Sequence, residues 1–169
     1  MKRAFNLVTY NFDETGLRIG VGKDQWIITR DSSREMYLGS STNRDFVTVC
    51  EAISGDGTVL PPMVILSGVL HQRQWYTSTN MPDNTLIALS DTGYSNDDII
   101  LRWLAHFERF TSRCKTGAYR LLLLDGYGSH CTKQFIDYCD RYNITPFCFP
   151  PHTTHLLQPL DVVFQPYKH

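Results

Sequence analysis

The sequence lacks a surplus of charge of either sign. Its 169 residues include 16 lysines and arginines against 17 aspartates and glutamates, which gives a net charge of −1 at neutral pH. A domain that grips a nucleic-acid backbone by itself usually carries an excess of basic residues. Any affinity for nucleic acid must therefore be local, or be supplied by residues outside this chain.

Long apolar runs and paired cysteines are also missing. No segment approaches the roughly 18 consecutive apolar residues of a membrane-spanning helix. The apolar stretch after Met1 is broken by polar residues too soon for a secretion signal. The five cysteines are odd in number and include no C-x-x-C pair, which favours reduced thiols over a disulfide framework. We therefore expect an intracellular protein with no membrane partner.

Two familiar catalytic signatures are broken. Gly22-Lys23 lacks the earlier glycine of a phosphate-binding P-loop, because Leu17 holds that position. Residues 126–129 (GYGS) do not form the G-x-S-x-G turn of serine esterases. We expect no nucleotide cofactor and no esterase chemistry. No repeat or long linker divides the chain, so residues 1–169 are predicted to form one domain.

The first half of the chain is rich in strand-forming residues. Residues 4–13 predict a strand that ends at Asp13. Residues 46–54 and 58–66 predict a hairpin around the turn Gly55-Asp56-Gly57. Pro61-Pro62 places the second strand of this hairpin at an edge or a bulge, because proline cannot donate a hydrogen bond to the sheet.

The second half alternates helical and strand patterns. After Ser95, the predicted N-cap, apolar residues recur at helical spacing to about residue 113. Residues 119–124 predict a buried strand, residues 132–141 a helix and residues 144–149 a strand. Residues 156–167 look like the start of a last helix. This order predicts an α/β fold with a mixed central sheet flanked by helices.

Two aspartates follow apolar strands. Asp13 and Asp125 each precede a turn-prone segment, and the carboxyl ends of adjacent strands in an α/β sheet face one crevice. Two carboxylates there repel one another unless a cation lies between them, and Mg²⁺ prefers such oxygen ligands. Asp161 is a third candidate, at the predicted start of the last helix. Each aspartate alone is also explained as a turn former or a helix cap.

Three segments together resemble a known family. Residues 10–16 (YNFDETG), 121–130 (LLLLDGYGSH) and 150–164 (PPHTTHLLQPLDVVF) are similar to the catalytic motifs of DDE-type transposases. The similarity is to the pogo branch of the mariner superfamily, and the 35 residues between Asp125 and Asp161 match the spacing in its fungal members. The three motifs occur in the family's order and span nearly the whole chain.

The resemblance implies a ribonuclease-H-like fold and a metal-dependent DNA endonuclease and strand-transfer core. Asp13, Asp125 and Asp161 would be the catalytic residues and would bind two Mg²⁺ or Mn²⁺ ions for in-line attack on a phosphodiester. The implied partner is DNA at transposon ends, the implied location is the nucleus, and the chain could act as a homodimer.

Four neighbouring residues could contact DNA or support the metal-binding carboxylates: Ser129, His130, His155 and Gln158. Ser129 and His130 are also explained as a cap of the following helix. A zinc site built from Cys139, Cys148 and the nearby histidines is not expected, because their spacing matches no ordinary structural zinc motif.

The sequence also departs from the family's pattern. Only twelve residues precede Asp13, so the chain is expected to lack the N-terminal helix-turn-helix region that recognises transposon ends. Eight residues follow Asp161, so the last helix is expected to be truncated. An alternative function is therefore an inactive or domesticated transposase fragment that acts as a DNA- or protein-binding module, and catalytic activity is left open.

Overall fold

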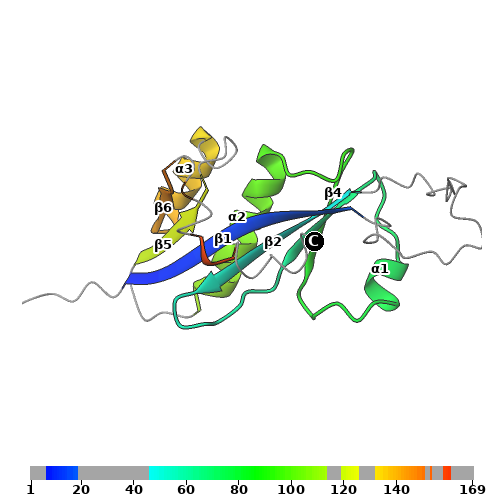
Figure 1. Cartoon of the computed structure of the whole chain (residues 1–169), viewed down its shortest axis with the longest axis horizontal. Coiled ribbons are helices and arrows are strands. Elements are labelled where there is room, and N and C mark those ends of the chain that lie inside the picture. The colour runs from blue at the N-terminus through cyan, green and yellow to red at the C-terminus, as the bar shows by residue number, and fades with distance from the viewer. Residues whose placement is uncertain are drawn as a thin grey trace, which may run out of the picture.

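Figure 1 shows the computed structural model of the chain, which describes residues 7–18, 46–113, 119–125, 132–150, 153 and 158–160. The helices and strands follow one another as β1 (Leu7–Arg18), β2 (Phe46–Ser54), β3 (Met63–Ser67), α1 (Gln74–Thr77), β4 (Leu86–Ser90), α2 (Asp97–Thr111), β5 (Tyr119–Leu124), α3 (Lys133–Arg141) and β6 (Ile144–Cys148). That residues 1–169 form a single domain stays a prediction.

The strands form one mixed sheet in the order β4-β3-β2-β1-β5-β6. The pairs β1/β2 and β2/β3 are antiparallel, whereas β3/β4, β1/β5 and β5/β6 are parallel. The predicted α/β fold with a mixed central sheet is therefore confirmed. Strand β1 lies near the centre of the sheet, between an antiparallel and a parallel neighbour.

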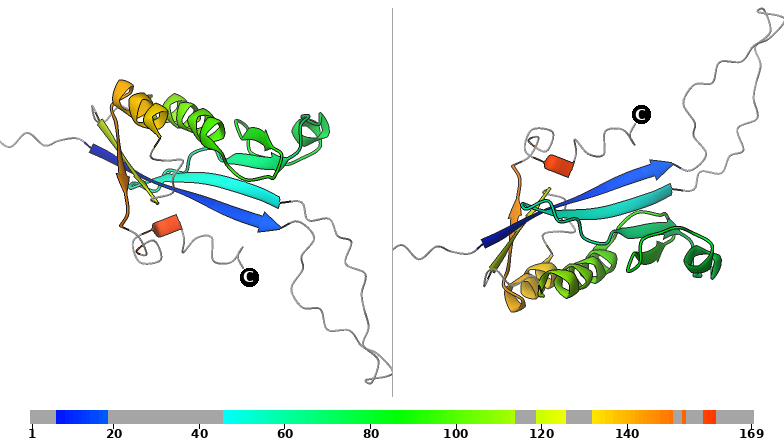
Figure 2. Two further views of the ribbon diagram at one scale, coloured as in Figure 1. Left: turned by 90° about the horizontal axis from the view of Figure 1, so that it is seen from above. Right: turned by 90° about the horizontal axis from the view of Figure 1, so that it is seen from below.

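One face of the sheet is covered by α2 and α3 (Figure 2), and the core lies beneath them. Tyr10 and Phe12 of β1 point to this face: Tyr10 packs edge-on against Phe107, and Phe12 packs against Trp103 with ring centroids 3.9 Å apart. Burial of such aromatic side chains is a major source of stability. The short segment 158–160 lies on the opposite side of the sheet.

Strand β1 does not end at Asp13, as predicted, but continues to Arg18. The reason is its partner β2, which pairs with β1 as far as Arg18 opposite Phe46. Gly16 is a packing glycine and not a turn: a Cβ atom there would lie 2.2 Å from Cζ of the Phe46 ring. The absence of a side chain at Gly16 therefore lets the strand run on beneath this ring.

The predicted hairpin is confirmed, with a break in its second strand. An isolated bridge joins Ile53 to Val59, and β3 begins at Met63, directly after Pro61-Pro62. The edge position is wrong, because β3 pairs with both β2 and β4. Sequence reasoning missed β4 and the single-turn helix α1, which are short and lack a clear periodic pattern.

The predicted helices are confirmed within one or two residues. Asn96, not Ser95, caps α2: its side-chain oxygen accepts the N–H of Ile99 at 2.9 Å. Thr132 caps α3 in the same way. Of the predicted last helix, only residues 158–160 are described, with Pro159 and Leu160 helical, and the rest lies outside the described residues. No helix in the described ranges has the length and apolar character needed to span a membrane.

Candidate active site

Asp13 lies in the middle of β1, on the face of the sheet away from α2. Successive side chains of a strand alternate between faces, and the preceding residue, Phe12, packs into the core beneath α2. Asp13 is half-buried, and its Oδ1 atom accepts the backbone N–H of Glu14 at 2.9 Å. This hydrogen bond holds the carboxylate in one orientation.

Asp125 follows directly on β5, the parallel neighbour of β1. The strand register pairs Asn11 with Leu123, so Asp13 and Asp125 each come two residues later along adjacent strands. Strand β5 ends at Leu124, which agrees with the predicted position of Asp125 at a carboxyl end. The structure thus brings the first two predicted site residues to the same level of the sheet, although Asp13 is not at a strand end.

The segment before Asp161 is hydrogen-bonded to β1 beside Asp13. The side-chain amide of Gln158 donates to the carbonyl oxygen of Phe12 at 3.1 Å, and the backbone N–H of Leu160 donates to Oδ1 of Asn11 at 3.1 Å. Gln158 and Leu160 are both only 3 % exposed. Gln158 therefore anchors this segment to the central strand. Its burial leaves little surface for a contact with DNA.

The remaining candidates cannot be located in the same way. Asp161, Ser129, His130 and His155 lie outside the described residues. Among the residues that the structure does describe, no group of three potential metal ligands lies together. The set formed by Asp13, Asp125 and Asp161 is therefore still a prediction. The two described members offer carboxylate oxygens, the ligand type that suits Mg²⁺ and Mn²⁺.

Two further acidic residues lie next to Asp13, one on the neighbouring strand and one on β1 itself. Glu51 of β2 is paired directly with Asp13, and Glu14 is paired with Cys50. Directly opposite carboxylates destabilise a sheet unless a cation offsets them, so the pair fits a cation-binding surface. Sequence reasoning missed Glu51, because only the register of β2 against β1 reveals it.

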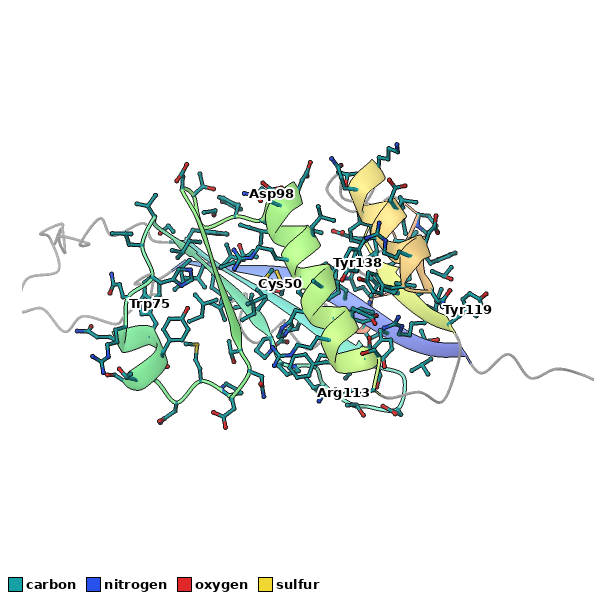
Figure 3. All side chains as sticks on the ribbon, turned by 180° about the vertical axis from the view of Figure 1, so that it is seen from behind. Cys50, Trp75, Asp98, Arg113, Tyr119 and Tyr138 are labelled. Atoms are coloured by element: carbon teal, nitrogen blue, oxygen red, sulfur yellow. The ribbon has the colours of Figure 1, made fainter. Side chains whose placement is uncertain are left out.

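Two titratable groups near Asp13, Glu51 and Cys50, have raised pKa values. Burial raises the pKa of the Glu51 carboxyl above its ordinary value. Burial also raises the pKa of the Cys50 thiol well above its ordinary value, with smaller contributions from the negative charges of Glu14 and Asp13. Cys50 lies on the sheet beside α2 (Figure 3). It is therefore a neutral core thiol.

The two cysteines considered for a zinc site lie in different surroundings. Cys139 is fully buried in the core, and burial raises its pKa to about 12, so it stays protonated at neutral pH. Cys148, in contrast, is exposed. His152 and His155 lie outside the described residues. The expectation that the cysteines are free is met by Cys50, Cys139 and Cys148.

A cavity of about 330 Å³ borders Asp125. Glu14 and Gly16 of β1 form one side of it, and the loop residues Tyr94 and Ser95 form another. Since Glu14 and Gly16 alternate with Asp13, this cavity opens on the other face of β1. Asp125 therefore lies level with Asp13 along the sheet and also borders the cavity.

Comparison with known proteins shows what the chain is similar to. Residues 43–169 match the family model described as DDE superfamily endonuclease. The chain is 35 % identical over 161 residues to a Cochliobolus lunatus protein named MFS-type transporter clz9, covering 94 % of this chain and 17 % of that protein. It is 28 % identical over 140 residues to the human pogo transposable element with ZNF domain, covering 82 % of this chain and 10 % of that protein.

Solved structures of similar fold include complexes of Mos1 transposase. The paired-end complex of Mos1 transposase with the left transposon end matches with a TM-score of 0.53 and 13 % identity, over 91 % of this chain and 38 % of that chain. The Mos1 strand transfer complex matches with a TM-score of 0.50 and 12 % identity, over 90 % of this chain and 37 % of that chain. This likeness confirms the ribonuclease-H-like fold. The chain spans less than half the length of any of these proteins.

Proposed function

The chain belongs to the DDE superfamily endonucleases, of the mariner and pogo kind, and we propose that it is a metal-dependent core that cleaves and joins DNA. The observation that carries this proposal is the position of two aspartates. Asp13 and Asp125 lie at the same level of adjacent parallel strands, and the segment before Asp161 is hydrogen-bonded to β1 beside them. We propose transposon ends as the DNA substrate and the nucleus as the place of action.

Asp13, Asp125 and Asp161 are the residues that would hold two Mg²⁺ or Mn²⁺ ions. Bound in a pair, such ions stabilise the attacking and the leaving oxygen of an in-line displacement at phosphorus. The chain's own contribution is orientation. The N–H of Glu14 fixes one oxygen of Asp13, and Gln158 holds the segment before Asp161 against the carbonyl of Phe12. Both contacts set the positions of ligands in advance, which lowers the cost of assembling the site.

Binding of DNA needs more than this chain's charge. With a net charge of −1, the chain gains little from general attraction to phosphates. We propose that sequence recognition and much of the grip come from residues outside this chain, or from a second copy in a homodimer. The curated relatives support the first source, because the chain covers only 17 % and 10 % of their lengths.

Cleavage of a supercoiled plasmid in Mn²⁺ tests the proposal. We expect the wild-type chain to nick the plasmid only when Mn²⁺ or Mg²⁺ is present, and Asp125→Asn to lose this activity because the weakened ligand no longer holds the ions. The matched control is Asp137→Asn, which changes an exposed aspartate of α3 and should cut as the wild type does. Thermal unfolding confirms that all three proteins fold.

The same assay addresses the alternative function. Equal inactivity of the wild type and Asp125→Asn, in folded proteins, would contradict the nuclease and favour an inactive DNA- or protein-binding module. Equal activity of both would place the chemistry away from Asp125.

A further inference from the structure

The cavity beside Asp125 has an aromatic wall that the metal site does not use. The rings of Phe46 and Tyr94 stack with centroids 4.2 Å apart and planes inclined by 25°. The outer ring belongs to Tyr94, which is 54 % exposed. A flat, partly exposed aromatic surface next to a cavity is a platform on which another planar ring can stack.

Two glycines make this wall possible. The ring of Phe46 occupies the space of a side chain at Gly16, where a Cβ atom would lie 2.2 Å from it. Gly93 has a φ of +77°, and a Cβ atom there would lie 2.1 Å from the carbonyl oxygen of Phe46. The loop that carries Tyr94 is thereby held close against the start of β2. The wall is a built part of the fold.

The polar groups of the cavity present mainly acceptors. Ser95 donates its hydroxyl proton to Oε2 of Glu14 at 2.6 Å, and Thr48 donates its own to the carbonyl of Gly93 at 2.8 Å. Each hydroxyl proton is thereby used, so that each hydroxyl oxygen can only accept a further hydrogen bond. The carboxylate of Glu14 adds acceptors and negative charge, and Asp125 borders the cavity.

These features select the chemistry of the occupant. The carboxylate of Glu14 repels a phosphate group inside the cavity, whereas the aromatic wall favours a neutral planar ring. An acceptor-rich lining favours a ring that carries donors, and a carboxylate is a known acceptor for the amino group of cytosine. The volume of about 330 Å³ is in the range of small-molecule pockets.

We propose that this cavity receives an unstacked nucleobase with an exocyclic amino group, from the DNA strand whose phosphate lies at Asp125. The inference rests on the proposed function. Adenine, cytosine and guanine carry such an amino group, and thymine does not. The base would stack on Tyr94 and donate to the acceptors around Glu14. This contact would fix the strand next to the phosphate that is cut.

Binding of short single strands tests the proposal directly. The probes are fluorescein-labelled twelve-residue oligonucleotides of only dA, only dC or only dT, followed by anisotropy in Ca²⁺. We expect the wild-type 169-residue chain to bind the dA and dC strands more tightly than the dT strand. Tyr94→Ala should weaken binding of the dC strand by about 5- to 150-fold, the range for loss of one base-stacking aromatic residue.

Two variants make the result specific. Tyr94→Phe retains the ring and should bind as the wild type does. Tyr119→Ala removes another tyrosine, 49 % exposed, at the first residue of β5 and hence at the opposite end of that strand from Asp125 (Figure 3). It should leave all three affinities unchanged. If Tyr94→Ala fails to fold, Tyr94→Leu replaces it, since leucine fills the site without an aromatic face.

Unchanged affinities in a folded Tyr94→Ala or Tyr94→Leu chain would overturn the base pocket, as would a wild type that binds none of the strands. Plasmid cleavage distinguishes failure of the base pocket from failure of the proposed nuclease function. A chain that cuts plasmid and ignores loss of the Tyr94 ring has nuclease activity but no base pocket. A chain that needs the ring for binding but never cuts plasmid has the pocket without the nuclease.

Discussion

The two faces of strand β1 are built from opposite kinds of residue. On the face beneath α2, Tyr10 and Phe12 pack against Phe107 and Trp103 in the apolar core, and Glu14 lies farther along this face beside the cavity. On the other face the same strand carries Asn11, Asp13 and Thr15. Asn11 is only 5 % exposed and Thr15 only 2 %. The second face is therefore polar and nevertheless largely buried.

A buried polar face lowers the stability of the fold when its polar groups lack hydrogen-bond partners. Within the described part of the chain, the side-chain nitrogen of Asn11 and the hydroxyl of Thr15 are buried without a hydrogen-bond partner. Burial of polar groups in this state costs free energy. One strand thus separates two roles: its core face stabilises the fold, and its polar face gives up some stability in the region where we propose the catalytic site.

The largest effect should come from the core face. Phe12→Ala removes a side chain that is 1 % exposed and should lower the free energy of unfolding by about 3–5 kcal/mol, as truncation of buried aromatic residues does. Its neighbour variant Asp13→Asn should change the free energy of unfolding by less than about 1 kcal/mol, because it keeps the shape of the side chain and also relieves the repulsion from Glu51. Urea denaturation measures both. Losses of equal size would contradict the division of roles between the faces.

A smaller loss is expected where the last described segment meets the polar face. Gln158→Ala removes the donor to the carbonyl of Phe12 and should lower the free energy of unfolding by about 1–3 kcal/mol, the cost of an unsatisfied buried group. Gln134→Ala, at an exposed position of α3, is the control and should be near neutral. Two equal urea midpoints would show that the segment contributes nothing to the fold.

Removal of a charge from the polar face should raise the free energy of unfolding instead of lowering it. Glu51→Gln relieves the repulsion from Asp13 directly across the sheet and should stabilise the metal-free chain by about 0.2–1 kcal/mol. The pKa of Glu51 is raised by burial above 4.5. Its contribution to stability is therefore fully present below pH 4.5 and is lost as the pH rises through the folded-state pKa.

The gain in Glu51→Gln should accordingly grow with pH over that window, as followed by thermal unfolding in EDTA. Asp91→Asn, at an exposed loop position, is the control. A destabilised Glu51→Gln chain in EDTA would mean that Glu51 makes favourable contacts without any cation.

The smallest effect is expected at His106, on the helix that covers the core face. Burial lowers its pKa below 6.5, although its hydrogen bond to the carbonyl of Pro61 at 2.9 Å partly opposes this. The unfolded chain then takes up the proton more readily, so this contribution to stability is present above pH 6.5 and is lost as the pH falls through the folded-state pKa. His106→Gln should abolish this part of the pH dependence in thermal unfolding. An unchanged pH profile in His106→Gln would contradict a contribution of His106 to the pH dependence of stability.

Local sequence patterns predicted much of this architecture. The apolar run at residues 119–124 and the helical spacing after residue 95 predicted β5 and α2, because both elements depend on their own periodicity. The end of β1 was wrong, because Gly16 resembles a turn until the ring of Phe46 is placed over it. Close packing between distant residues leaves no local signal.

The candidate site shows the same limit. The location of Asp13 and Asp125 after apolar residues led to both, Asp161 was found at the predicted start of the last helix, and the resemblance joined the three into one set. Glu51 could not be found, since its position opposite Asp13 depends on the register between two strands. The aromatic wall of Phe46 and Tyr94 joins residues that are 48 positions apart.

The central claim is that Asp13, Asp125 and Asp161 share one pair of divalent cations. Titration of the 169-residue chain with Mn²⁺, followed by electron paramagnetic resonance of the free ion, measures this without any DNA. We predict that the wild type binds two Mn²⁺ ions and that Asp13→Asn, Asp125→Asn and Asp161→Asn each weaken binding, while the exposed-site variant Asp137→Asn binds normally. Binding that is the same in all five proteins would contradict the shared metal site.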